Sequence, residues 1–214
     1  KRLWDSLMAM AEIGATPKGG VKSLTLTDVD KAGRDRFRGW CEALGLTVRV
    51  DSIGNMFARR EGRDPKRLPV LLGSHLDSQP TGGKFDGALG VIAGLEVMRS
   101  LNDLNIVTEA PIELVNWTDE EGSRFGHSLM GSGVWAGIYT QEKAYSLRDV
   151  DGVSVGDALD AIGYKLTKNG DALRIRRLKS NRMPKAKRQA AKAKRPAQVD
   201  PNSPFAKLQD LALN

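Results

Sequence analysis

Two short segments gather most of the residue types that bind metals and move protons. The first, GSHLDSQPTGGKFDGALG, covers residues 73–90, and the second, WTDEEGSRFG, covers residues 117–126. Histidine nitrogens and carboxylate oxygens are common protein ligands of Zn²⁺ and Mn²⁺, and carboxylates also serve as general bases. Together the segments indicate half of a hydrolase site built on two metal ions.

In the first segment, one residue separates His75 from Asp77. If this stretch is extended, both side chains leave the same side of the backbone, so Asp77 could accept the second ring N–H of His75 and fix its tautomer. Asp86 lies in the loop TGGKFDG, whose glycines let a carboxylate approach an ion closely. We therefore expect a metal site that includes His75 and Asp86, with Asp77 orienting the imidazole.

In the second segment, Glu120 and Glu121 are adjacent carboxylates. Such a pair is costly on an exposed strand edge, whereas a nearby dication would neutralise it. Neighbouring side chains point in different directions, so one glutamate could bind metal while the other acts on water. A lone His-x-Asp or Glu-Glu is usually an ordinary surface feature. Only the combination with the glycine-rich loop favours a metal site.

The residues that follow allow more than one interpretation. Arg124 either pairs with one of the acidic side chains and holds the loop, or is a chance neighbour, and His127 is expected to be structural or exposed. Residues 131–133, Gly-Ser-Gly, favour close packing or a helix start, although their N–H groups could also face a substrate oxyanion. Trp117 and Trp135 are expected to lie in the core.

Length and composition predict one globular domain with an extension. The chain has 214 residues, 40% of them hydrophobic, which is enough for one core of ordinary size. No apolar run approaches the ~20 residues that cross a bilayer. The first residues do not form a secretory signal, and Cys41 is the single cysteine, which excludes an internal disulfide. These features predict a soluble, cytoplasmic protein.

The formal net charge of +7 is unevenly distributed. Lysine and arginine gather in residues 165–214, so residues 1–164 carry a net negative charge, and nucleic-acid binding by the whole chain is not supported. We expect residues 165–214 to form a basic, partly disordered tail. A short C-terminal helix, capped by Asn202 or Ser203, would follow. The alternative is a weak phosphate-backbone binder that lacks aromatic residues for stacking on bases.

The body of the chain alternates between helical and strand patterns. Apolar residues recur at helical spacing over 3–13, 28–44 and 87–101. Strands are predicted over 46–50, 55–58, 69–73 and 111–117, with a hairpin at 51–54. Asp28 is expected to cap the second helix, and Leu89 and Val97 are expected to face inward on the third.

This alternation predicts an α/β fold, a layered mixed sheet with helices on both faces. His75 to Asp77 and Asp119 to Glu121 would lie just beyond the carboxyl ends of strands. In open α/β sheets this is where ligands bind.

The two segments, together with MGSGVWAG and the opening WDSLMAMAEIGATPKGGVKSLTLTDVD, resemble an amidase family. It contains N-carbamoyl-L-amino acid hydrolases, β-ureidopropionases and allantoate amidohydrolases, within the M20 group of dinuclear metallopeptidase-like enzymes. The resemblance covers about residues 2–164. It implies that residues 1–164 are the N-terminal part of a catalytic domain that hydrolyses linear C–N bonds of ureido or carbamoyl compounds.

The resemblance also implies roles for individual residues. His75 would bind one Zn²⁺ or Mn²⁺, Asp86 would bridge the two ions, and Glu121 would bind the second. Glu120 would be the general base that acts on the bridging water, with Asp77 as the partner of His75. Departing ammonia would take the proton from Glu120 as carbamate forms.

Three features depart from the family pattern. The position of Asp119 is commonly Asn in similar proteins. Family members are about twice as long and include a dimerisation and lid domain, through which they form homodimers. Each metal also has a further His ligand downstream, whereas here the resemblance fades after 161–164, and His127 follows the Glu-Glu pair too closely to substitute.

These departures predict a truncated hydrolase with weak metal binding, an open pocket and poor activity by itself. Three functional hypotheses follow from the sequence. The chain is a metal-dependent amidohydrolase acting on a small ureido or carbamoyl substrate, or a noncatalytic remnant that acts as an interaction protein, or its tail binds nucleic acid.

Overall fold

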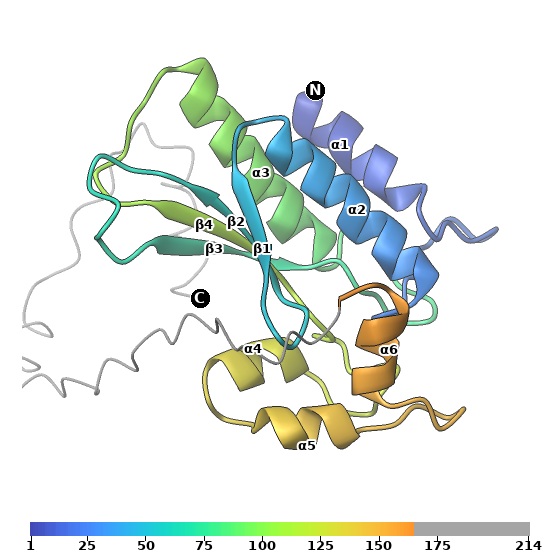
Figure 1. Cartoon of the computed structure of the whole chain (residues 1–214). Helices are drawn as coiled ribbons and strands as arrows, with labels where there is room; N and C mark the ends of the chain where they lie inside the picture. Colours follow the sequence, from blue (N-terminus) through green and yellow to red (C-terminus); the bar gives the residue numbers. More distant parts are fainter. Residues whose placement is uncertain (165–214) are drawn as a thin grey trace, which may run out of the picture. The chain divides into compact units, whose positions relative to one another are not determined.

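The computed structural model describes residues 1–164, and within them a four-stranded mixed sheet forms the centre of the fold (Figure 1). Its strands are β1 (Thr47–Val50), β2 (Met56–Arg60), β3 (Val70–His75) and β4 (Ile112–Trp117). They are arranged in the order β1-β2-β4-β3. β2 runs antiparallel to both β1 and β4, whereas β3 and β4 are parallel. All four strands agree with the sequence prediction to within two residues.

The predicted hairpin connects β1 to β2. The Asp51 carboxylate accepts hydrogen bonds from the backbone N–H groups of Ile53 and Asn55, at 3.1 and 2.9 Å. Gly54 has a φ of +87°, which a residue with a Cβ rarely adopts. The aspartate and the glycine therefore determine this turn locally.

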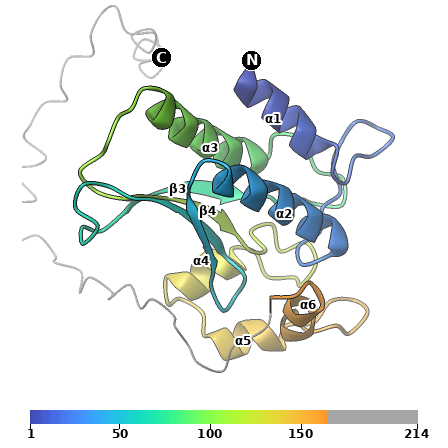
Figure 2. The same ribbon diagram turned by 45° about the horizontal axis from the view of Figure 1, so that its top comes forward.

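Three helices cover one face of the sheet: α1 (Arg2–Ala11), α2 (Asp28–Glu42) and α3 (Ala88–Asp103) (Figures 1 and 2). Alternate residues of the central strands, such as Met56 and Leu114, point into this layer and are fully buried. They pack with Phe37 of α2 and with Leu95 of α3. This is the main core of the fold.

The helices differ from the prediction in two details. The cap of α2 is Thr27 rather than Asp28, because the Thr27 hydroxyl accepts the N–H of Asp30. On α3, Leu89 and Val97 are exposed and do not face inward. The apolar stripe of α3 is centred on residues 91, 92, 95 and 98, and at 100° per residue Leu89 and Val97 lie on the opposite side.

The remaining helices, α4 (Met130–Trp135), α5 (Gln141–Ser146) and α6 (Val155–Ala161), form a second cluster. In both views they lie on the side of the sheet away from α1 and α3 (Figures 1 and 2). Trp135 of α4 packs against Trp117 of β4, with ring centroids 5.4 Å apart. The predicted core positions hold only in part, because Trp117 is half-buried and Trp135 is exposed. The architecture is the predicted α/β type.

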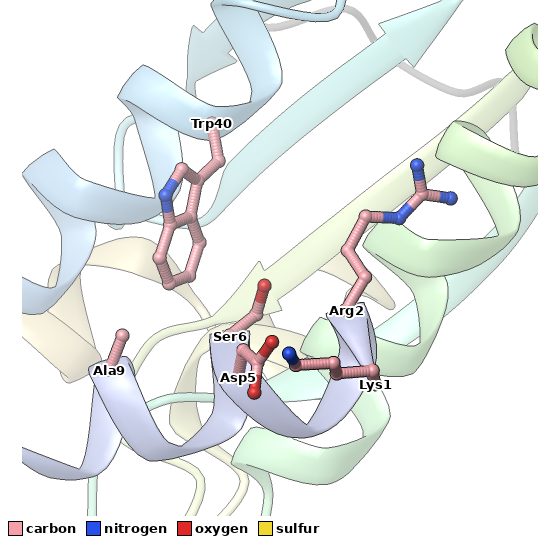
Figure 3. A pocket seen from close by; sticks show the side chains of 6 residues that line it. All are labelled: Lys1, Arg2, Asp5, Ser6, Ala9 and Trp40. Carbon is pink, nitrogen blue, oxygen red and sulfur yellow. The ribbon is translucent and has the colours of Figure 1, made fainter.

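A shallow hollow lies between the start of α1 and Trp40 of α2 (Figure 3). Arg2 turns away from it and forms ion pairs with Glu96 and Asp103 of α3, at 2.7 and 2.8 Å. Within the described part of the chain, Asp5 is the only carboxylate that lines the hollow, and no histidine or cysteine does. It therefore offers no metal-ligand set.

Among residues 1–164, no helix has the length and apolar character needed to span a membrane. The predictions for the basic tail, its C-terminal helix and its nucleic-acid binding concern residues 165–214, which lie outside the described residues. The division of the chain at residue 164 stays a prediction.

Candidate metal centre

The two motif segments meet at the edge of the sheet where the parallel strands β3 and β4 end. His75 is the last residue of β3, Trp117 is the last residue of β4, and the two are partners in the strand register. The loops after both strands therefore begin side by side. This brings residues about 45 positions apart in the sequence into one site, as the strand pattern predicted.

The imidazole of His75 is almost completely buried and has one ring nitrogen engaged. Nδ1 lies 2.9 Å from the backbone carbonyl oxygen of Asp77. Because a carbonyl only accepts, Nδ1 carries the proton in the neutral ring, and Nε2 keeps a lone pair for a metal ion. Nε2 now faces the Glu120 carboxylate at 3.3 Å. The backbone of Asp77 therefore has the orienting role that the sequence analysis gave to its side chain.

The Asp77 carboxylate instead connects the two loops. Its oxygens accept the backbone N–H groups of Glu120 and Glu121, each at 3.3 Å, and Oδ1 lies 3.6 Å from Nδ1 of His75. The side chain of Asp77 is 2% exposed. Asp77 thus ties the position of the Glu-Glu pair to that of the histidine.

The structure brings together His75, Asp86 and Glu121, the three residues predicted to bind metal. One ligand atom from each lies within 4.8 Å of the others. Gln79 donates to Oε2 of Glu121 at 3.0 Å. Oε1 of Glu121 is buried and has no hydrogen-bond partner among the described residues. A cation would satisfy this oxygen, so the donor set fits a divalent metal ion with nitrogen and oxygen ligands.

Gly87 lies directly against the ring of His75. Its φ and ψ are +63° and −54°, and Ala88 N–H donates back to the Asp86 carbonyl, which makes a γ-turn. A Cβ at this position would lie 2.5 Å from both ring nitrogens of His75. The turn therefore holds Asp86 beside the histidine, and only glycine fits there. The sequence analysis identified Gly87 only as a residue that gives the loop conformational freedom.

Burial and the acidic surroundings shift three pKa values in this site. Burial disfavours the charged form of His75, but the Asp77 carboxylate outweighs burial, and Glu120 adds to it, so the pKa of His75 is raised to about 9. Burial raises the pKa of Glu120, and the carboxylates around it add to that shift while His75 opposes it. Burial, with Asp77 and Asp30 nearby, raises the pKa of Asp119 to about 8. A dication would relieve this concentration of negative charge.

A buried polar network fixes the start of the second loop. The Asn55 side chain accepts the N–H of Thr118 and donates to the carbonyl of Gly131, both at 3.0 Å. Asp119 then adopts a φ of +52°, and its two carboxylate oxygens are buried without a partner among residues 1–164. The positioning roles of Asn55 and of Gln79 were not predicted from the sequence. Gln79 lies inside the first motif, but Asn55 is distant in sequence and gave no signal.

Arg124 holds the second loop, but through a partner that the sequence did not reveal. Its guanidinium pairs with Asp149 at 3.0 Å and donates to the carbonyls of Thr25 and Leu26. His127 packs edge-on against a tyrosine ring, Tyr139, with centroids 4.4 Å apart. It is not a member of the metal-ligand group formed by the described residues.

The glycines of α4 serve close packing. A Cβ on Gly131 would overlap the Asn55 side chain, and its N–H donates to the carbonyl of Thr118 at 2.8 Å. The N–H of Gly133 donates to the carbonyl of Leu129. These two N–H groups are occupied, so the oxyanion interpretation is wrong for both glycines.

Comparison with known proteins assigns the family. The family model described as peptidase family M28 matches residues 55–205. The chain belongs to peptidase family M28. The M20 label that the motifs implied stays a prediction.

The relatives that the chain resembles include amidohydrolases. The chain is 56% identical over 163 residues to an N-carbamoyl-L-amino-acid amidohydrolase of Rhizobium meliloti. The matched region covers 76% of this chain and 39% of the relative. The chain is 32% identical over 160 residues to an allantoate amidohydrolase of Bacillus subtilis. That match covers 75% of this chain and 39% of the relative. A hydantoinase/carbamoylase family amidase from Burkholderia multivorans has a TM-score of 0.75 and 60% identity, and covers 76% and 40%.

These matches confirm the resemblance that the motifs indicated. They also show that the chain spans about two fifths of the length of the relatives that it matches. What the relatives do as whole proteins therefore bears on this M28 chain as a hypothesis about its site.

Proposed function

We propose that this chain provides a metal-dependent site for hydrolysis of a linear C–N bond in an N-carbamoyl amino acid or related ureido acid. The observation that carries the proposal is the convergence of His75, Asp86 and Glu121, with Glu120 beside them. Three ligand side chains next to a further carboxylate are the parts that metal-assisted hydrolysis requires. The amidohydrolase relatives supply the substrate class.

Each residue has a distinct part in the proposed reaction. His75, through Nε2, and the carboxylates of Asp86 and Glu121 would hold Zn²⁺ or Mn²⁺. When bound, such ions polarise the ureido carbonyl and lower the pKa of water. Glu120 takes the proton from the attacking water and delivers it to the nitrogen that leaves as the C–N bond breaks. The raised pKa of Glu120 suits a group that must both accept and return a proton.

The contacts of Asp77 couple the metal ligands to the base. The Asp77 carboxylate fixes the backbone of Glu120 and Glu121. The backbone carbonyl of Asp77 orients the His75 ring. Loss of the Asp77 side chain would therefore displace a ligand and the general base together. Such supporting contacts are typically worth 10–100-fold in metal affinity or activity.

Metal titration of the full chain by calorimetry tests the proposal. We expect Glu121→Gln to abolish binding of Zn²⁺ and Mn²⁺, because it replaces a charged ligand by a neutral one of the same shape. Glu120→Gln should keep metal binding but abolish any hydrolysis of N-carbamoyl amino acids. Glu42→Gln, at an exposed position that ends α2, is the matched control and should change neither.

Two results would contradict the proposal. One is metal binding that Glu121→Gln and Glu42→Gln affect equally. The other is turnover that survives Glu120→Gln. Metal affinity is measured separately from activity, so a chain that binds metal without turnover still reports on the site.

A second candidate function is an interaction role through the edge of β3. Among the described strands, β3 pairs only with β4, so its other edge is open. Leu68 and Val70 beside this edge are 64% and 57% exposed. Open strand edges with apolar side chains pair readily with other chains. Concentration-dependent self-association that Val70→Lys removes would support this role, and a monomer at all concentrations would contradict it.

A further inference from the structure

A hollow of about 230 Å³ lies beside the candidate metal centre, between the end of β4 and the helix α4. It is lined mainly by aromatic and branched apolar side chains: Trp117, Leu129, Trp135, Ile138 and Tyr139. Pockets that enclose whole small ligands usually measure roughly 300–1,000 Å³. This hollow is smaller, so its size suits one side chain of a ligand and not a complete molecule.

The apolar side chains of this hollow are unusually open to solvent. Ile138, Leu129 and Trp135 are 73%, 50% and 40% exposed, although each is large and apolar. Apolar groups gathered in this way at the surface mark a binding site more often than scattered exposed residues do. None of the described residues that line it carries a charge. The hollow therefore favours an apolar ligand group over a charged one.

The local backbone is built to keep the hollow in shape. A Cβ on Gly133 would overlap the ring of Tyr139, so glycine lets this ring lie over α4. Leu129 has a φ of +57°, a left-handed conformation that is costly for leucine. Trp135 is held against Trp117 in an edge-on arrangement. Strain of the kind seen at Leu129 is concentrated at functional sites.

Two contacts join the hollow to the metal centre. Trp117 is the register partner of His75, so both side chains leave the same face of the sheet from strands that lie about 4.8 Å apart. The N–H of Leu129 donates to the carbonyl of Glu120 at 2.7 Å. One wall of the hollow therefore begins beside the metal ligand, and another is bonded to the proposed general base.

We propose that this hollow binds the amino-acid side chain of the substrate and selects N-carbamoyl amino acids with a large apolar side chain. The inference rests on the proposed function, because it places the ureido carbonyl at His75, Asp86 and Glu121. In an N-carbamoyl amino acid, the side chain branches from the carbon that follows the ureido nitrogen. With the carbonyl at the metal centre, this branch would extend along the face of the sheet that carries both His75 and Trp117, towards the hollow.

The same geometry disfavours polar ureido compounds. Allantoate carries a second ureido group where an amino acid carries its side chain. Placing that group against Trp135 and Ile138 would remove its hydrogen bonds to water without replacing them. Trp135 and Ile138 are thus specificity-determining residues and take no part in the chemical step.

Titration of the full chain with N-carbamoyl-L-phenylalanine and N-carbamoylglycine, in the presence of Mn²⁺, tests this inference. Tryptophan fluorescence reports occupancy of the hollow, and saturation-transfer NMR on the ligands provides an independent measure. We expect the phenylalanine derivative to bind at least about tenfold more tightly than the glycine derivative, because only the former buries an aromatic ring.

The matched variants are Ile138→Ser and Trp135→Ala, with Val150→Ser as the control. Val150 is 99% exposed and lies outside the hollow. The first two variants change exposed positions, so folding is retained, and each should reduce the phenylalanine preference to about threefold or less. Val150→Ser should keep the full preference. All three should bind Mn²⁺ as the parent chain does.

The outcomes separate this inference from the proposed function. Normal metal binding with equal affinity for the two ligands, or with no binding of the phenylalanine derivative, would overturn the side-chain pocket alone. The opposite result is also possible to distinguish. If Ile138→Ser reduces the phenylalanine preference but Glu121→Gln leaves metal binding unchanged, the proposed metal centre is overturned and the pocket is retained.

Discussion

Substitution of Gly87 by alanine should dismantle the metal centre while leaving the fold intact. The added methyl group would lie 2.5 Å from both ring nitrogens of His75. Residue 87 would also have to keep a φ of +63°, which an L-residue with a Cβ adopts only at a cost. Because Gly87 is in a loop beside an almost buried ring, the least costly response is for His75 and the γ-turn to separate.

The expected loss of metal affinity follows from two costs, that of the positive φ and that of the added methyl group. The left-handed conformation costs about 1–2 kcal/mol, and forcing an extra methyl group into a filled space costs about 1–3 kcal/mol. If the site relaxes by moving His75 away, metal binding must restore the strained arrangement and bear this cost. A penalty of about 2 kcal/mol corresponds to a loss of roughly 30-fold in affinity, which is the minimum we expect.

Gly83→Ala, in the same glycine-rich loop, is the control. A Cβ there has no heavy atom within 4 Å, and the backbone of Gly83 is not in the left-handed region. This substitution should leave metal affinity unchanged and raise stability slightly, by about 0.4–1 kcal/mol. Calorimetric titration with Zn²⁺ or Mn²⁺ measures the affinities, and urea unfolding measures the stabilities. Equal metal affinity of Gly87→Ala and Gly83→Ala would refute the reasoning.

Four further predictions concern ionisable groups. With the pKa of His75 raised to about 9, protons compete with metal, so Mn²⁺ affinity should rise about tenfold per pH unit from 6.5 towards 9 in calorimetric titrations. A pH-independent affinity would exclude His75 as a ligand. Without metal, the stability that His75 contributes is complete below its unfolded pKa of 6.5 and is lost as pH rises to about 9, which urea unfolding at several pH values checks. Arg34→Met removes the ion-pair partner of the fully buried Asp30, so it should lower the free energy of unfolding in urea by about 3–5 kcal/mol. Adding Asp30→Asn should recover part of this loss, and a double variant without any recovery would argue against the ion pair. Burial raises the pKa of the Cys41 thiol to about 12, so a thiol reagent should label Cys41 only after unfolding, and rapid labelling of the native chain would contradict its burial.

Local sequence signals were sufficient for most of the fold. Apolar residues at helical and alternating spacing predicted α1, α2, α3 and all four strands, because burial of one face imposes these periods on the sequence. Local signals did not give the exact start of α2 or the inward face of α3. Thr27 competes with Asp28 for the cap, and the inward side of α3 depends on how the helix is rotated against β3 and β4.

The ligand types of the candidate site were also readable from the sequence. His75, Asp86 and Glu121 stand in motifs whose chemistry is explicit in their side chains, and strand periodicity placed His75 and Glu121 near strand ends. Their convergence within 4.8 Å depends on the parallel pairing of β3 with β4, a contact between distant parts of the chain. No local pattern encodes that pairing.

The sequence by itself determined which groups are available: one imidazole, several carboxylates and glycines that free the loop. Only the tertiary structure decided how they are used. In the fold, the ring of His75 hydrogen-bonds to the backbone carbonyl of Asp77, and the carboxylate of Asp77 accepts the N–H groups of the Glu-Glu loop. The tertiary structure also placed an apolar hollow beside them. The physical reason is that hydrogen-bond partners and packing contacts depend on distances between strands and loops, which are set when the whole core forms and not by neighbours in sequence.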